Sequence, residues 1–156
     1  GSETSEASVP LLGMYTAAKH AMKGFTDALR VETEEVDKAN VSITLVEPQS
    51  VDTPFPQHAR NYMDREPRLS SPTVSAERVA KAILRAAVRP TRVARVGGGS
   101  MLNTTFARMA PGFADRLAAK QYARQQADRQ PVDPRGVLFR SSETTGFVGQ
   151  MSGLEM

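Results

Sequence analysis

An apolar, β-branched run that ends in proline is the feature that most constrains the fold of this chain. The run is VSITLVEP, Val41 to Pro48, and it follows a long helical pattern that extends from Pro10 to about Asn40. A continuous apolar run of this length is typical of a strand that is buried in a sheet. A helix that leads directly into such a strand indicates alternating strands and helices, and therefore a parallel sheet in an α/β fold.

The helical segment carries two apolar stripes. Each stripe has the spacing of one helix face. The first stripe holds the larger side chains and consists of Ala18, Met22, Phe25 and Leu29. The second stripe holds small residues only and consists of Ala17, Ala21, Gly24 and Ala28. A surface helix needs only one apolar stripe, so we expect this helix to be covered from two sides. We expect the larger side chains to face the sheet and the small stripe to pack against another helix.

The chain after the strand predicts further elements of the same kind. Residues 49–72 contain Pro54, Pro56, Pro67 and Pro72 and little periodicity, which indicates a long loop with one short helix. SAERVAKAILRAAVRP predicts a helix with Ser75 as its N-cap, and residues 92–96 predict a second strand. Two helices are expected between residues 100 and 122, followed from Gln130 by an extended tail.

Composition excludes several classes of site and partner. The 156 residues include no cysteine, which excludes disulfides and cysteine-ligated metals and fits a reducing compartment. The sequence contains no run of about eighteen apolar residues, which is the length that a membrane-spanning helix needs. A net charge of +3 without dense basic runs does not indicate nucleic acid. We therefore predict a cytoplasmic protein without a metal site or a transmembrane segment.

Tyr15 and Lys19 stand one helical turn apart on a segment that is otherwise small and apolar. A fixed ammonium about 6 Å from a phenol, at an effective dielectric constant of about 20, favours the phenolate by roughly 2–3 kcal/mol. A tyrosine so placed can exchange a proton with a substrate hydroxyl or carbonyl near neutral pH. The spacing alone also fits an ordinary pair at the rim of a helix, with both polar tips in water.

The stretch GSETSEASVPLLGMYTAAKHAMKGFTDALRVE closely resembles the active-site segment of the classical short-chain dehydrogenases/reductases. That family has a Ser, then a Pro, then Tyr-x-x-x-Lys, then a Gly-Phe-x-x-x-Leu-Arg helix, which is the order found here. ITLVEPQSVDTP resembles the family's next strand and its Pro-Gly-x-Val-x-Thr turn, with Gln49 in place of the usual glycine. The resemblance covers residues 1 to about 98.

The resemblance implies three catalytic residues. Ser2 would hydrogen-bond the substrate oxygen and steady the developing oxyanion, and Tyr15 would be the general acid–base. Lys19 would favour the Tyr15 phenolate and hold the ribose hydroxyls next to the nicotinamide. Ser2 also fits a purely structural role as a hydroxyl at the end of a strand.

The resemblance also implies NAD or NADP as the cofactor. Pro48, Val51 and Thr53, with Tyr15 and Lys19, would hold its nicotinamide end. Val51 would act through its backbone and Thr53 through its hydroxyl. Thr53 also fits a structural role as a helix N-cap.

The loop from Pro54 to Pro72, here called the substrate loop, is expected to close over the substrate. The residues expected to contact the substrate are Phe55, His58, Tyr62 and Met63. Their mixed apolar and aromatic character fits a lipid, a steroid or a small ketone equally. His58 also fits a solvated loop histidine.

The Gly-rich phosphate loop of the family, which should lie well upstream of the active site, is not found here, and the residue that chooses NAD or NADP is missing too. GGGS, residues 97–100, lacks the G-x-G-x-x-G spacing. We therefore expect the C-terminal half of a Rossmann-like, doubly wound parallel sheet. Residues 1–98 would be part of the dinucleotide-binding domain, and residues 99–156 a helical C-terminal extension and tail. This chain alone is expected to be inactive.

The leading interpretation is an NAD(P)-dependent oxidoreductase that interconverts an alcohol and a ketone or aldehyde by hydride transfer. It would act on a small molecule as a homodimer or homotetramer, built partly on the helix that carries Tyr15. The alternative is a non-catalytic domain on the same scaffold, used for assembly or protein binding. The intact set of Ser2, Tyr15 and Lys19 argues against that alternative.

Overall fold

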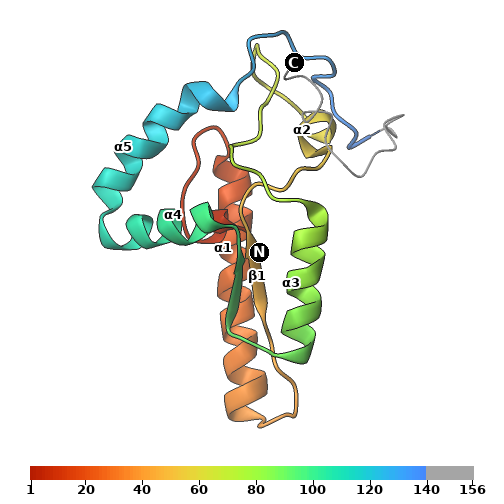
Figure 1. Ribbon diagram of the computed structural model, residues 1–156, viewed down its shortest axis with the longest axis vertical. Helices are drawn as coiled ribbons and strands as arrows, with labels where there is room; N and C mark the ends of the chain where they lie inside the picture. Colours follow the sequence, from red (N-terminus) through yellow and green to blue (C-terminus); the bar gives the residue numbers. More distant parts are fainter. Residues whose placement is uncertain (140–156) are drawn as a thin grey trace.

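The computed structural model describes residues 1–139, with the side chains of 100–104, 106, 121 and 123 left out. The chain is a mixed α/β structure in which two long helices flank a small sheet (Figure 1). The elements in chain order are η1 (Glu3–Ser5), α1 (Gly13–Arg30), η2 (Val31–Val36), β1 (Leu45–Pro48), α2 (Phe55–His58), α3 (Ala76–Val88), β2 (Val93–Val96), α4 (Gly98–Met109), α5 (Pro111–Gln121) and η3 (Tyr122–Gln125).

The strands β1 and β2 pair in parallel, with Leu45 opposite Val93 and Pro48 opposite Val96. The helix α3 joins them, as a parallel pair requires a crossover connection. The pairing extends past β1, because the Gln49 N–H donates to the Val96 carbonyl at 3.0 Å. The predicted parallel sheet and the alternation of helix and strand are thus confirmed.

The first strand begins at Leu45 rather than at Val41, because the preceding backbone bonds to α1 and η2 instead of to β2. The Ile43 N–H donates to the Glu34 carboxylate at 2.7 Å. The Ile43 carbonyl accepts from the Arg30 guanidinium at 3.0 Å. The apolar pattern therefore predicted a strand in the right place but made it too long.

The helix α1 turns a polar side toward the sheet. Arg30 is buried, and its guanidinium also donates to the Arg92 carbonyl, at 3.1 Å, at the start of β2. Lys23 forms an ion pair with Glu6, at 3.8 Å, in the segment after η1. These bonds position α1 through charged side chains rather than through apolar packing.

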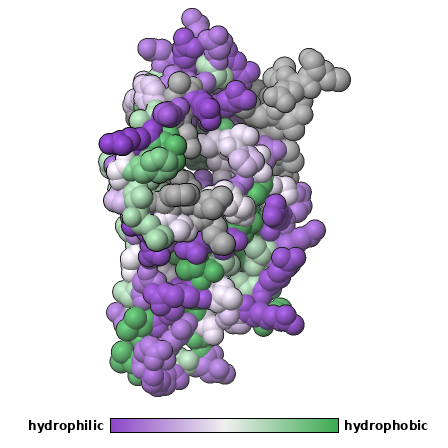
Figure 2. Space-filling view, turned by 60° about the vertical axis from the view of Figure 1, so that its left-hand side comes forward, coloured by the Kyte–Doolittle hydropathy of each residue, from purple (hydrophilic) through white to green (hydrophobic). Residues whose placement is uncertain are grey.

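The two apolar stripes of α1 lie in solvent, so the prediction that the larger one faces the sheet is wrong. Phe25 is 70% exposed and Met22 is 46% exposed. The small stripe is exposed as well, from Ala17 to Ala28. Figure 2 shows apolar side chains among hydrophilic ones on one face of the molecule. The periodicity identified the stripes, but it carried no information about what covers them.

The helix α3 begins as predicted. The Ser75 hydroxyl caps it by accepting from the Arg78 N–H at 3.3 Å, and Glu77 lies in its first turn. The apolar core beside it is small and includes Leu45, Val74 and Val96. Leu45 is the first residue of β1 and Val96 the last residue of β2, so the core extends along the length of the two strands.

The predicted pair of helices in the C-terminal region is also present, as α4 and α5. Phe113 and Leu117 of α5 are 51% and 41% exposed. After α5 the chain returns to the substrate loop near α2 (Figure 1). Within the described residues, none of the helices has the length and apolar character that a membrane span needs.

Candidate active site

A cavity of about 290 Å³ lies where the C-terminal end of β1 meets η1 and the first turn of α1. In α/β proteins ligands bind at this edge of the sheet. The cavity is lined by residues that the sequence analysis singled out, namely Ser2, Tyr15, Pro48, Val51, Thr53 and Phe55. Residues from well-separated parts of the sequence therefore meet around one small space.

Tyr15 reaches the cavity from the first turn of α1. Its ring centroid lies 6.1 Å from that of Phe55, with the two rings tilted by 44°. The Lys19 ammonium lies 5.3 Å from the Tyr15 ring centroid, and its Nζ is 3.9 Å from the Met22 sulfur. Lys19 itself is not among the residues that line the cavity.

Ser2 is buried and forms the N-cap of η1. Its hydroxyl oxygen accepts from the Thr4 N–H at 3.3 Å, and its own N–H donates to the Ser5 hydroxyl at 3.2 Å. A serine hydroxyl has one donor hydrogen and two acceptor lone pairs. The cap uses an acceptor, which leaves the hydrogen of Ser2 for a partner in the cavity.

The turn after β1 presents backbone groups to the site. Val51 and Val74 form a parallel β-bridge. Its two hydrogen bonds, both 2.9 Å, run from the Asp52 N–H to the Val74 carbonyl and from the Val74 N–H to the Ser50 carbonyl. Because those bonds belong to the flanking residues, the N–H and C=O of Val51 point away from Val74. The Thr53 hydroxyl donates to the Val51 carbonyl at 3.4 Å. Thr53 does not cap α2, whose N-cap position is Pro54.

Gln49 is a cavity residue whose role the sequence analysis missed. Its side chain is 7% exposed, donates to the Pro72 carbonyl at 2.6 Å and accepts from the Gly99 N–H at 3.2 Å. It thereby ties the end of β1 to the substrate loop and to α4. The one available signal was its departure from the family's glycine.

The substrate loop lines the cavity with its two ends and not with its middle. Phe55 lies at one end, and Leu69 and Ser70 at the other. His58, Tyr62 and Met63, which were expected to face the substrate, are not among the lining residues. Tyr62 is 81% exposed, with the Arg60 guanidinium 4.9 Å from its ring centroid.

Two carboxyl groups in and beside the site have perturbed acidities. Burial raises the pKa of Glu3, which lines the cavity. Burial also raises the pKa of Glu47, whose side chain in β1 is fully buried. The nearby Glu6 pushes the pKa of Glu47 the same way, while the Arg95 guanidinium, 3.6 Å away, opposes it. Both carboxyl groups therefore take up a proton more readily than an exposed carboxyl group does.

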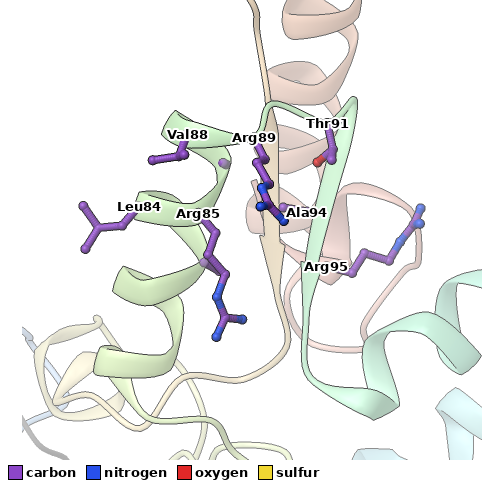
Figure 3. Close-up of a pocket in the computed structure, with 9 residues that line it drawn as sticks. Leu84, Arg85, Val88, Arg89, Thr91, Ala94 and Arg95 are labelled. Carbon is purple, nitrogen blue, oxygen red and sulfur yellow. The ribbon is translucent and has the colours of Figure 1, made fainter.

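A wider hollow of about 630 Å³ lies elsewhere, between α3 and β2 (Figure 3). Arg85 and Arg89 extend toward the space between helix and strand, beside Ala94, while Leu84 and Val88 point away from the strand. None of the predicted site residues lines this hollow. The smaller cavity is therefore the candidate active site, because it gathers the groups that can carry chemistry.

Comparisons with known proteins point in the same direction. Residues 1–64 match the family model of the short chain dehydrogenases. The chain is also 36% identical over 137 residues to a protein named Uncharacterized oxidoreductase YxnA, from Bacillus subtilis (strain 168). That match covers 86% of this chain, and the chain spans 38% of the length of the curated relative. Both matches support the short-chain dehydrogenase family and an oxidoreductase.

Proposed function

We propose that this chain carries the active site of an NAD(P)-dependent short-chain dehydrogenase/reductase. The reaction would interconvert an alcohol and a ketone or aldehyde. The observation that supports this best is that Ser2, Tyr15 and Thr53 line one small cavity at the C-terminal end of a parallel strand. The family match and the oxidoreductase relative support the same class of enzyme.

In this proposal Tyr15 is the general acid–base. Its phenolate accepts the proton of a substrate hydroxyl in the oxidation, and its phenol returns the proton to the carbonyl oxygen in the reduction. The Lys19 ammonium, 5.3 Å from the ring centroid, would attract the negative charge that forms on the tyrosine oxygen during proton transfer. The Ser2 hydroxyl donates its hydrogen to the same substrate oxygen, which steadies the negative charge that develops there.

The lining residues fit the nicotinamide end of NAD or NADP. Val51 would bond the carboxamide through its backbone, beside Pro48 and the Thr53 hydroxyl, and Lys19 would hold the ribose hydroxyls. A volume of about 290 Å³ is at the lower end for small-molecule sites, so it suits a nicotinamide or a small substrate group and not a whole dinucleotide. When bound, the nicotinamide takes up or supplies the hydride at the substrate carbon.

Two further parts of the proposal concern the rest of the protein. The chain spans 38% of its longer relative, and we propose that the pyrophosphate-binding unit is supplied by sequence outside the 156 residues. Residues 1–98 would then complete a dinucleotide-binding domain, and residues from 99 on would form its extension. The exposed stripes of α1, which include Phe25, would be covered in a homodimer or homotetramer.

The substrate would bear an apolar group beside its reacting carbon, because Phe55 and Leu69 line the cavity. His58, Tyr62 and Met63 would meet it only if the loop moved.

The test uses the intact protein that contains this chain. NADH and NADPH binding is followed by nucleotide fluorescence, and turnover by nicotinamide absorbance with a panel of small aldehydes, aliphatic ketones and aromatic ketones. We expect saturable binding of one nucleotide and turnover of at least one carbonyl class. An intact protein that binds neither nucleotide would overturn the proposal and favour the non-catalytic scaffold.

A further inference from the structure

The chain after α5 pairs with the substrate loop through backbone hydrogen bonds (Figure 1). We call residues 125–137 the strap. Pro67 and Gln126 form an antiparallel bridge. The bonds between strap and loop run from Arg68 N to Gln125 O (2.7 Å), Ala127 N to Glu66 O (2.8 Å), Glu66 N to Arg129 O (3.0 Å), Asn61 N to Pro134 O (3.0 Å) and Val137 N to His58 O (3.0 Å). The strap therefore holds the middle of the loop at several points.

A buried carboxylate adds to this pairing. Glu66 is 5% exposed, and its carboxylate accepts from the Val132 N–H at 2.9 Å. This bond joins a buried side chain of the loop to the backbone of the strap. Arg65 and Asp128 also pair across strap and loop, but both side chains are exposed, so this ion pair contributes little.

Gly136 allows the strap to approach the loop backbone closely. It has φ +64°, a conformation that favours glycine. A Cβ at this position would lie 2.6 Å from the His58 carbonyl oxygen and 2.7 Å from the Arg60 nitrogen. Both contacts are with backbone atoms, which cannot rotate away as the end of a flexible side chain can. A side chain at position 136 would therefore push strap and loop apart.

The strap bonds to the loop between the two ends that line the cavity. Phe55 lines the cavity from one end of the loop, and Leu69 and Ser70 line it from the other, while the strap binds the residues between. We infer that the docked strap fixes these two ends and so keeps the substrate side of the cavity narrow. On this inference, which rests on the proposed function, Gly136 and Glu66 are positioning residues that select small carbonyl substrates over bulky ones.

The first test does not depend on activity. Hydrogen–deuterium exchange is measured on the intact protein, the Gly136→Ala variant and the Gly112→Ala variant. Gly112 lies in α5 with nothing within 4 Å of an added Cβ, so it is the matched control. In Gly136→Ala the amides of Asn61, Glu66 and Arg68 should exchange about tenfold faster or more, since a non-glycine residue is strained there. Unchanged exchange in Gly136→Ala, or an equal increase in both variants, would overturn the inference.

The second test separates positioning from general loss of structure. Propanal serves as the small carbonyl probe and benzophenone as the bulky one. In Gly136→Ala the ratio of kcat/KM for benzophenone to that for propanal should rise by about tenfold, through KM for the carbonyl, with KM for the nucleotide unchanged. A constant ratio, or an equal fall with both probes, contradicts substrate selection by the strap.

A pair of variants at position 66 covers the case in which Gly136→Ala does not fold. Glu66→Gln keeps an oxygen acceptor for the Val132 N–H, whereas Glu66→Leu removes it. Amide exchange in the loop and the benzophenone-to-propanal ratio should both rise in Glu66→Leu and stay near wild type in Glu66→Gln. Equal behaviour of the two variants would overturn the role of Glu66. If the wild type reduces neither probe nor any other carbonyl, the proposed function and the substrate selection both fail, while exchange still decides whether the strap holds the loop.

Discussion

The Lys19 ammonium lies 5.3 Å from the centroid of the Tyr15 ring, one helical turn along α1. The cation thus sits against the face of the phenol whose oxygen is proposed to move a proton. The Tyr15 ring also lies 6.1 Å from the Phe55 ring. These contacts involve the ring and not the hydroxyl, so removing the hydroxyl alone leaves the packing of the site in place.

The first prediction follows from that separation of ring and hydroxyl. Tyr15→Phe should lower turnover by about two orders of magnitude or more, because the proton carrier is lost, while nucleotide binding is largely kept. Steady-state kinetics and fluorescence titration of the intact protein measure the two effects. Tyr62→Phe is the control, since Tyr62 is 81% exposed and outside the cavity. Near-normal turnover in Tyr15→Phe would show that Tyr15 is not the acid–base.

The second prediction concerns the Lys19 ammonium beside the Tyr15 ring. Lys19→Ala should reduce turnover and also weaken nucleotide binding, since one ammonium is proposed both to favour the phenolate and to hold the ribose. The control is Lys38→Ala, which removes an exposed ammonium that pairs with Glu35 at 2.9 Å. Both variants are titrated with NADH and NADPH. An unchanged nucleotide Kd in Lys19→Ala would contradict the cofactor role of Lys19.

The third prediction concerns Gln49, which joins three parts of the site. Gln49→Leu keeps the approximate size of the side chain but leaves the Pro72 carbonyl and the Gly99 N–H without their partner. Each of these hydrogen bonds contributes about 0.5–1.5 kcal/mol net, and water can take the place of Gln49 at its partners because Pro72 and Gly99 are exposed. Urea unfolding should show this loss in the free energy of unfolding. Gln130→Leu, at an exposed position, should be close to neutral, and equal stability of the two variants would rule out the bridging role.

The fourth prediction concerns acid stability. The Lys23 hydrogen bond, helped by Arg30 and Arg92, lowers the pKa of Asp27 from 3.8 to about 2. A carboxyl whose pKa is depressed on folding stabilises the protein above its unfolded pKa, and this stabilisation is lost as the pH falls toward the folded pKa. Asp27→Asn should therefore lower stability at neutral pH and flatten the loss of stability between about pH 4 and pH 2.

Circular dichroism melts across that pH range test the prediction. Asp37→Asn, at an exposed position next to η2, is the control and should keep the wild-type profile. A wild-type acid profile in Asp27→Asn would mean that the cluster around Asp27 does not govern acid unfolding.

The sequence predicted those parts of the fold and site that local patterns encode. Such patterns lie within one element or between consecutive elements. Examples are the spacing of Tyr15 and Lys19, the cap at Ser75, and the helix between two strands that indicates a parallel sheet. By contrast, the substrate loop is joined to the strap by backbone hydrogen bonds between segments that lie far apart in the chain. Backbone pairing of irregular segments leaves no periodic pattern of side chains, so nothing in the sequence predicted it.

The orientation of α1 was predicted wrongly for a related reason. Periodicity reports that one helix face is apolar, but it does not report which surface covers that face. Here Arg30 anchors the helix through the Ile43 and Arg92 carbonyls, and these acceptors belong to the backbone, where any residue type could supply them. Both apolar stripes were therefore correctly found, and the stripe of larger residues was wrongly assigned to the sheet.

The last prediction concerns what covers those stripes in the intact protein. A Cβ added at Gly24 meets nothing within 4 Å, so the single chain has room for a larger side chain there. If α1 packs against a second copy through its small residues, Gly24→Leu should overpack that contact at a cost of about 1–3 kcal/mol and shift the intact protein toward smaller species. Gly112→Leu, equally open in α5, should leave the assembly unchanged. Size-exclusion chromatography with light scattering gives the molar mass of each variant, and a wild-type mass for Gly24→Leu would show that this face of α1 is not the contact between subunits.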